Sequence, residues 1–141
     1  MSDRKLVHTL RMPIRWGDMD AMGHVNNTIY FRYFEQARIE WFLELDTPAD
    51  PTRLFGPVII NAHCAFLRQL RYPGEIEVTT YVGAIGRSSF ETIQEVRRVD
   101  QSDVVAASGG AKVVWIDYRL EKSVAMPDSL RQRLTHGTAP Q

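Results

Sequence analysis

Five side chains that can do chemistry are crowded into one short segment, residues 17–27, with the sequence GDMDAMGHVNN. They are two carboxylates, one imidazole and two carboxamides, contributed by Asp18, Asp20, His24, Asn26 and Asn27. A carboxylate can act as a nucleophile or take a proton from water, and an imidazole can carry a proton. Aspartates in such loops also commonly accept hydrogen bonds from nearby backbone N–H groups. Residue types alone therefore leave a catalytic and a structural interpretation open.

The same spacing begins like a calcium-binding loop, D-x-D-x-x-G, and then departs from it. Met22 stands at the third ligand position, and Ile29 stands where a bidentate glutamate belongs. No further cluster of histidine, cysteine or carboxylate residues completes a zinc or iron site. Cys64 lies in an apolar strand-like segment without an adjacent acid–base pair, so we expect a core residue and not a nucleophile. We expect no metal.

A long and very apolar helix is predicted directly after this loop, over residues 28–45. Asn26 or Asn27 is a good N-cap, because an asparagine oxygen can accept a free N–H of the first helical turn. Only a narrow polar side is expected, formed by Arg32, Glu35, Gln36, Arg38, Glu40 and Glu44. Such a helix must be covered on most of its circumference. The polar loop is thus placed at the positive end of a buried helix.

Strand-like segments account for most of the remaining chain. Residues 6–16 alternate in polarity, and Pro13 favours an edge or end position there. The other four segments are residues 58–70, 74–85, 88–100 and 104–118, with turn residues between them that predict successive hairpins. Each run is long, so the sheet should be strongly curved. A short helix over residues 128–134 follows Pro127, and residues 135–141 are expected to form a disordered tail.

The order of strand, long helix and four antiparallel strands predicts an α+β fold in which one curved five-stranded sheet wraps the helix. The length of 141 residues and the absence of a linker or repeat indicate one domain spanning residues 1–141. The helix carries more apolar surface than one small sheet covers, and edge strands need protection. We therefore expect a homodimer or homotetramer, joined through sheet edges or helix faces.

The composition of the chain argues against two classes of partner, nucleic acids and membranes. Lysine and arginine number 17 and so do aspartate and glutamate, so no global field attracts nucleic acid or an anionic membrane. No apolar run approaches the length of a membrane span, and the first residues lack the apolar core of a secretory signal. A single cysteine rules out an internal disulfide. These features favour a cytoplasmic protein with neither a nucleic-acid nor a membrane partner.

One long motif carries a resemblance to a known family. Residues 16–38 read W-G-D-M-D-A-M-G-H-V-N-N-x-x-Y-x-x-Y-F-E-x-A-R, and further similarity lies in LRQLRYPGEIEV at residues 67–78 and IGRSSF at residues 85–90. The chain resembles the hotdog-fold acyl-CoA thioesterases of the 4-hydroxybenzoyl-CoA thioesterase type. The resemblance implies a hotdog fold and hydrolysis of an acyl-CoA to a free acid and CoA. It implies no cofactor, because CoA is part of the substrate.

The resemblance also implies roles for individual residues. The second aspartate of the G-D-x-D loop is the family's catalytic carboxylate, which places that role on Asp20 as nucleophile or general base. A backbone N–H near Asn27 would polarise the thioester carbonyl, and the partial positive charge of a helix N-terminus suits a developing oxyanion. Asp18 is expected to tie the loop together. Asn26 and Tyr30 are expected to contact the substrate.

The motif differs at one position from that of several bacterial members of the family. Asn27 stands where several bacterial members have His or Tyr, and His24-Val25-Asn26-Asn27 instead resembles the H-V-N-N of plant acyl-ACP thioesterases. The acyl carrier, CoA or acyl carrier protein, therefore stays open, and His24 is a candidate second catalytic or positioning group. The alternatives to an acyl-CoA hydrolase are an acyl-ACP thioesterase and a non-catalytic acyl-CoA or acyl-carrier binding module. A hotdog hydratase would need a different Asp/His arrangement.

Further substrate contacts are expected away from the loop. Asn61 and His63 are two residues apart and should share one strand face, where they either line the acyl pocket across a dimer interface or form a polar pair in the sheet. Arg87, Ser88 and Ser89 form a basic, hydroxyl-rich turn that either binds the CoA phosphates or is simply solvated. Weaker phosphate candidates are Arg68, Arg71, Arg97 and Arg98.

Overall fold

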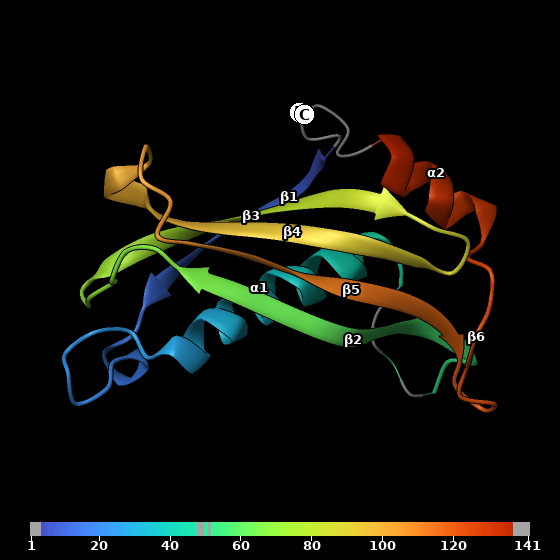
Figure 1. The fold of residues 1–141 in the computed structure, drawn as a ribbon, viewed down its shortest axis with the longest axis horizontal. Coiled ribbons are helices and arrows are strands. Elements are labelled where there is room, and N and C mark those ends of the chain that lie inside the picture. The colour runs from blue at the N-terminus through green and yellow to red at the C-terminus, as the bar shows by residue number, and fades with distance from the viewer. Residues whose placement is uncertain (1–3, 48–49, 51, 137–141) are drawn as a thin grey trace.

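The computed structural model describes residues 4–47, 50 and 52–136. The strands are β1 (Lys5–Ile14), β2 (Phe55–Phe66), β3 (Gly74–Ile85), β4 (Ser89–Arg98), β5 (Ala107–Asp117) and the two-residue β6 (Lys122–Ser123). The helices are α1 (Asn27–Glu44) and α2 (Asp128–His136), with short 3₁₀ turns at Trp16–Asp18 and Val99–Gln101. The elements are arranged as a long sheet with α1 on one side and α2 at one end (Figure 1).

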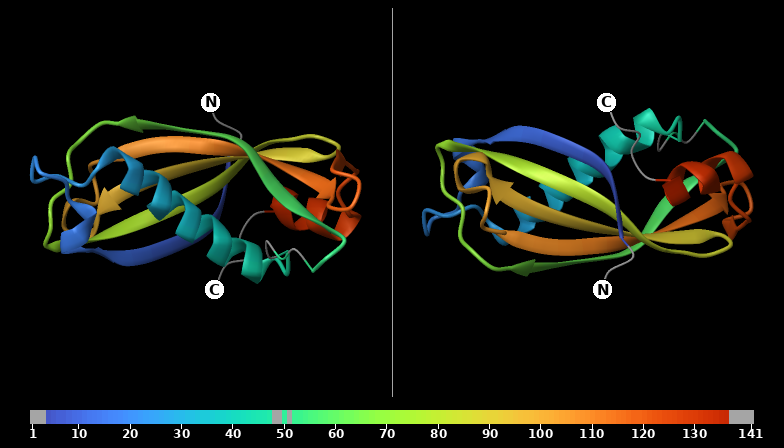
Figure 2. Two further views of the ribbon diagram at one scale, coloured as in Figure 1. Left: turned by 90° about the horizontal axis from the view of Figure 1, so that it is seen from below. Right: turned by 90° about the horizontal axis from the view of Figure 1, so that it is seen from above.

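The sheet is antiparallel, with the strand order β1-β3-β4-β5-β2, and β6 is paired to the end of β5. It curls so that α1 lies across its concave side, as Figure 2 shows from two directions. The predicted class, a curved sheet of five long antiparallel strands around one long helix, is therefore confirmed. Pro13 lies on β1, an edge strand, as expected for a residue without a backbone donor.

The prediction of successive hairpins is wrong for β2 and β3. Both edges of β3 are occupied, by β1 and β4, so β2 pairs with β5 at the other side of the sheet. Residues 67–73 therefore cross from one side of the sheet to the other instead of forming a tight hairpin. The hairpins from β3 to β4 and from β4 to β5 are present as predicted.

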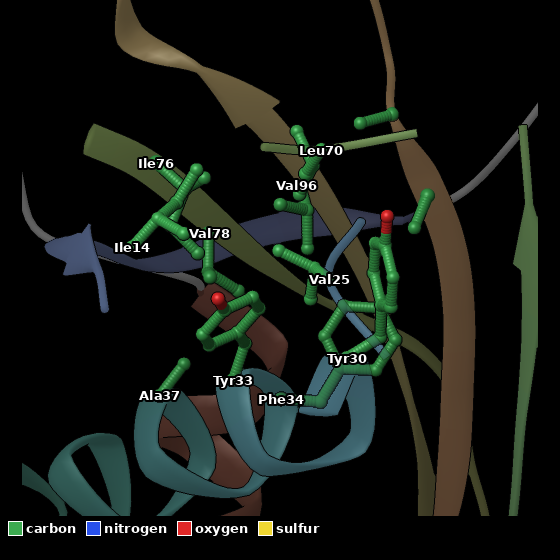
Figure 3. Close-up of a cluster of buried hydrophobic side chains, with 12 residues drawn as sticks. Ile14, Val25, Tyr30, Tyr33, Phe34, Ala37, Leu70, Ile76, Val78 and Val96 are labelled. Carbon is green, nitrogen blue, oxygen red and sulfur yellow. The ribbon is translucent and has the colours of Figure 1, made fainter. Parts of the chain in front are cut away.

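The core forms because alternate residues of the strands point toward α1. Near the start of the helix, Tyr33 and Phe34 pack with Ile76, Val78 and Val96 (Figure 3). Toward the other end of the sheet a second cluster gathers around α2; it includes Trp41, Phe42, Phe90, Val113, Leu130 and Leu134. The two clusters hold the helix along its length, so the loop before α1 starts from a fixed position.

The polarity of α1 differs from the prediction in one respect. Arg38, expected on the polar side, is 9% exposed, and its guanidinium lies 3.4 Å from the amide oxygen of Gln94. Gln94 in turn donates to the backbone oxygen of Phe34 and to the hydroxyl of Thr80, so a small polar network crosses the core. Burial lowers the pKa of Arg38. A hydrogen-bonded amide explains why a residue expected at the surface can be buried.

A single copy leaves apolar surface of α1 uncovered. Leu43 is 60% exposed, and Phe31 and Ile39 are more than one third exposed. The buried residues of the helix are Tyr30, Tyr33, Phe34, Ala37, Arg38, Trp41 and Phe42. As expected, α1 carries more apolar surface than the sheet of one chain covers.

Several element ends differ by a few residues. Strand β2 covers residues 55–66 and not 58–70, and β5 begins at Ala107 instead of residue 104. Helix α2 continues to His136, so Thr135 and His136 are helical and do not belong to a disordered tail; the predicted tail over residues 137–141 lies outside the described residues. Among the helices of the described residues, none is long and apolar enough to cross a membrane.

Candidate active site

The loop before α1 is a compact turn closed by its own backbone. Met19 and Val25 form an isolated antiparallel bridge, and the N–H of Asp20 donates to the backbone oxygen of His24 over 3.0 Å. The N–H of Gly23 donates back to the oxygen of Asp20, also over 3.0 Å. Gly23 has φ +78°, a left-handed conformation that residues with a Cβ rarely adopt. The glycine of the motif therefore allows the chain to reverse between Asp20 and His24.

Asp18 ties this loop to the helix, as expected. One of its carboxylate oxygens accepts the backbone N–H of Arg15 over 2.9 Å and the hydroxyl of Tyr33 over 2.8 Å. Burial and the Asp18 carboxylate raise the pKa of Tyr33. The phenol therefore stays protonated and remains a donor to Asp18. The role of Asp18 is to fix the loop against α1.

Asp20 has an exposed carboxylate with both oxygens engaged. One oxygen accepts the backbone N–H of Met22 over 2.9 Å, and the other lies 3.3 Å from the side-chain nitrogen of Asn26. The side-chain oxygen of Asn26 is the N-cap of α1, because it accepts the N–H of Thr28 over 2.9 Å. One carboxamide thus joins the Asp20 carboxylate to the start of the helix.

The first helical residue offers a free backbone donor. Asn26 caps the N–H of Thr28, and the N–H of Ile29 donates to the backbone oxygen of Asn26. Within residues 4–47, 50 and 52–136, no acceptor is found for the N–H of Asn27. This N–H lies at the positive end of an 18-residue helix. The arrangement is suited to a partial negative charge on a ligand.

A pocket of about 480 Å³ joins these groups. It is lined by Asp20, Met22, His24, Val25, Asn27, Tyr30, Phe66, Leu67, Arg68 and Gln69. Tyr30 is buried, its ring meets Phe66 edge to face at 5.2 Å, and its hydroxyl donates to the backbone oxygen of Arg68 over 3.3 Å. Burial raises the pKa of Tyr30. The pocket therefore has a polar side at the loop and an aromatic side between α1 and the end of β2.

His24 lies at the rim of this pocket, against a residue from the segment after β2. Its Nε2 atom is 2.9 Å from a terminal guanidinium nitrogen of Arg71. The pair is held by the neighbouring backbone, where the N–H of Val25 donates to the oxygen of Leu70 over 2.8 Å. The sequence predicts Arg71 only as a weak candidate for contact with the CoA phosphates. The partnership with His24 depends on two segments more than 40 residues apart, and no local pattern signals it.

Asn61 and His63 share one strand face, as predicted, and neither lines the Asp20 pocket of its own chain; a contact with the pocket of a second copy stays a prediction. They pair with Lys112 and Gly110, and a Cβ built on Gly110 would lie 3.4 Å from the His63 ring. On the preceding residue, a Cβ built on Gly109 would meet Phe34 of α1. Successive residues point to opposite sides of a sheet, so His63 and Asn61 lie on the side away from α1.

Arg87, Ser88 and Ser89 lie at the opposite end of the sheet from the Asp20 loop (Figure 1). The backbone oxygen of Ser88 accepts the N–H of Trp115, that of Arg87 accepts the N–H of Met126, and Arg131 of α2 also bonds this turn. The start of β3, by contrast, pairs with Ile14 next to the loop. The full length of β3 separates this turn from Asp20 in one chain.

Cys64 packs against the core cluster around α1, and burial raises its thiol pKa to about 11. A thiol that stays protonated at neutral pH is a poor nucleophile. Nor does any group of three or more His, Cys, Asp or Glu side chains within the described ranges have the arrangement of a metal site. The reactive side chains on the residues that line the pocket are the Asp20 carboxylate and the His24 imidazole, and Asn27 adds a free backbone N–H.

Comparison with known proteins agrees with this architecture. Residues 14–134 match the family model described as the thioesterase-like superfamily. A Pseudomonas aeruginosa protein provisionally described as a thioesterase has 35% identity and a TM-score of 0.87, covering 92% of this chain and 99% of its own. A Xanthomonas campestris protein provisionally described as an acyl-CoA thioesterase has 32% identity and a TM-score of 0.76, covering 86% and 100%.

A third relative is a protein of Aquifex aeolicus strain VF5, provisionally described as an esterase. It is 31% identical over 72% of this chain and 79% of its own length. The hotdog fold expected from the motif is thereby confirmed. The matches are to the broad superfamily and do not single out the 4-hydroxybenzoyl-CoA type.

Proposed function

Because this chain belongs to the thioesterase-like superfamily, whose general activity is thioester hydrolysis, we propose that it hydrolyses an acyl-CoA to the free acid and CoA. Asp20 supplies the reacting carboxylate, and the backbone N–H of Asn27 polarises the thioester carbonyl. CoA belongs to the substrate, so the reaction needs no further cofactor.

One observation carries this proposal. Asp20 and Asn27 line the same pocket, and Asn27 has a free backbone N–H. Asn26 contacts the Asp20 carboxylate and caps the helix that begins at Asn27. A thioester carbonyl placed there would have an oxygen acceptor facing an N–H donor and a carbon facing a carboxylate. An oxyanion formed at that carbonyl is stabilised by donors that are already in place.

Two routes use this geometry. In the first, an Asp20 oxygen attacks the thioester carbon, the C–S bond breaks, CoA leaves as a thiolate that takes a proton from solvent, and water then hydrolyses the mixed anhydride. In the second, Asp20 takes a proton from water while the water oxygen attacks the same carbon; the C–S bond then breaks and the CoA sulfur leaves with the proton that Asp20 had taken up. Both routes pass through a tetrahedral oxyanion beside Asn27.

The acyl group would lie along the aromatic side of the pocket. Tyr30 and Phe66 present ring faces and edges there, and the Tyr30 hydroxyl is already bonded to the backbone of Arg68. Tyr30 therefore contributes apolar surface more than a hydrogen bond. Asn26 acts chiefly through Asp20 and the helix.

A second copy of the chain would complete the substrate site. Strand β2 is an edge strand, and Ile59, Ile60 and Phe66 on it are exposed. Antiparallel pairing of β2 with the same strand of a second copy buries these side chains and removes the open edge. It also brings the far end of one chain, with Arg87, Ser88 and Ser89, next to the Asp20 pocket of the other. The CoA phosphates would meet that turn.

The test measures hydrolysis of a panel of short, long and aromatic acyl-CoAs. A thiol reagent detects the CoA that is released. We expect turnover on at least one of them, and Asp20→Asn should lower kcat on that substrate by about 10²–10⁴-fold. Wild-type turnover by Asp20→Asn would contradict the assignment of Asp20. Tight binding of acyl-CoA without thiol release would instead indicate a binding module. The same acyl groups attached to acyl carrier protein, in place of CoA, test whether the protein is an acyl-ACP thioesterase.

A further inference from the structure

The contact between His24 and Arg71 determines where the imidazole proton lies. A guanidinium has N–H donors and no acceptor, so the Nε2 atom of His24 must present its lone pair to Arg71 at 2.9 Å. A neutral imidazole that accepts at Nε2 carries its proton on Nδ1. With the lone pair engaged, Nδ1–H is the hydrogen-bonding group that the ring has left for a ligand.

We propose that Arg71 is a positioning residue that fixes His24 as the Nδ1–H tautomer, and that His24 serves the pocket as a neutral hydrogen-bond donor and not as a base. The inference rests on the proposed thioesterase function for its kinetic consequences, but the tautomer itself does not depend on that function. His24 lines the pocket beside Asp20 and Asn27. A second donor there adds to the backbone N–H that faces the carbonyl oxygen.

Arg71 can act in this way because its backbone is held from two sides. On one side, the N–H of Val25 donates to Leu70, which places residues 24 and 71 next to each other. On the other side, Arg98 at the end of β4 donates to the backbone oxygens of Arg71 over 2.8 Å and Pro73 over 3.1 Å.

Arg98 is itself fixed by Asp100, whose carboxylate accepts from Nε over 2.8 Å and from a terminal nitrogen over 3.2 Å. A bidentate pair of this kind sets the plane of the guanidinium. Gly74 leaves the space that this guanidinium occupies, since a Cβ on Gly74 would lie 2.3 Å from one of its nitrogens. The segment that carries Arg71 is thus clamped by residues outside the catalytic motif.

The competing role for Arg71 is a direct contact with the CoA phosphates, because its side chain is exposed beside the pocket. The two roles predict different losses. A phosphate contact affects KM for acyl-CoA and disappears with acyl-pantetheine, which has the same thioester but no phosphate. A positioning role lowers kcat, and it does so equally on both substrates.

The first experiment measures the tautomer by ¹⁵N-detected NMR of the imidazole rings. We expect the ligand-free wild type to show His24 protonated at Nδ1, and Arg71→Ala to shift His24 toward protonation at Nε2. His8, His63 and His136 are internal references. Arg68→Ala is the matched control, since Arg68 lines the same pocket but its guanidinium donates to the backbone oxygen of Leu67 and not to His24. A wild-type His24 protonated at Nε2, or a spectrum unchanged by Arg71→Ala, would overturn the proposal.

The second experiment compares Arg71→Ala on an acyl-CoA and the matching acyl-pantetheine. We expect kcat to fall by about tenfold or more on both, the scale of a misplaced catalytic group. A loss confined to KM for the acyl-CoA would overturn the positioning role and assign Arg71 to the phosphates. If no acyl thioester is hydrolysed, the proposed function fails while the NMR result still decides the tautomer.

Discussion

At the scale of single residues, Asn26 is the side chain on which the candidate site depends most. Its oxygen caps α1 and its nitrogen contacts Asp20, so one carboxamide fixes the distance between the carboxylate and the helix N-terminus. An asparagine can do both because it carries a donor and an acceptor on one planar group. Aspartate or serine would cap the helix equally well but would offer Asp20 no comparable amide donor.

Asn26→Ser should therefore separate stability from activity. We expect the melting temperature to stay near that of the wild type, because serine is a good N-cap. We expect kcat to fall about tenfold, since a lost hydrogen bond to a charged group is worth about 1.5 kcal/mol. Asn26→Ala is the matched variant that also loses the cap, at a further cost of about 1 kcal/mol in the free energy of unfolding. Wild-type kcat in Asn26→Ser would show that Asp20 does not need this contact.

The sequence was informative about these residues because the loop is local. Asp18, Asp20, Gly23 and Asn26 bond one another or their near neighbours in the chain, so their spacing alone implied a compact loop with an N-cap. Arg71 was missed as a partner of His24 because that contact requires residues 67–73 to cross the sheet. Such a contact has no periodicity that one sequence could reveal.

At the scale of elements, alternation and turn residues predicted β3 to the residue, because its inward positions Ile76, Val78 and Val82 are apolar and only Thr80 between them is polar. The pairing of β2 could not be predicted in the same way. Its partner is chosen by which edge of the sheet is free after β1 and β4 have paired with β3, and that is a property of the whole sheet. The burial of Arg38 likewise depended on Gln94, a residue of another element.

Gly109 shows how closely β5 approaches both its neighbour β2 and helix α1. A Cβ at this position would lie 2.1 Å from the backbone oxygen of His63 and 3.0 Å from the ring of Phe34. We expect Gly109→Ala to lower the free energy of unfolding by about 1–3 kcal/mol, as for other overpacked cores. The matched control is Gly83→Ala on β3, where the nearest atom to a new Cβ is a flexible side-chain carbon 3.4 Å away. Urea unfolding of both variants tests this, and equal stabilities would contradict it.

At the scale of the whole molecule, the predicted substrate residues other than Asn61 and His63 form two groups at opposite ends of the sheet. Asp20, His24, Asn27 and Tyr30 line one pocket, whereas the turn at residues 86–89 packs beside α2 at the other end. Sequence similarity identifies both groups without saying which chain contributes each one. Two-fold pairing through β2 would reconcile them, because it places opposite ends of two chains side by side.

Mixed dimers test this arrangement. A dimer of two Asp20→Asn chains should be inactive, because it lacks the reacting carboxylate. A dimer of two Arg87→Ala chains should bind acyl-CoA about tenfold more weakly, because a phosphate contact is lost. In a dimer of one Asp20→Asn chain and one Arg87→Ala chain, an intact Asp20 and an intact Arg87 meet at one of the two sites. At acyl-CoA concentrations below KM, the co-purified mixed dimer should therefore recover about half of the wild-type activity, more than either parent. Light scattering should show a dimer.

The contradicting outcome is a mixed dimer with no more than half the activity of the Arg87→Ala dimer. It would place both residues in the site of one chain, or would exclude Arg87 from the site.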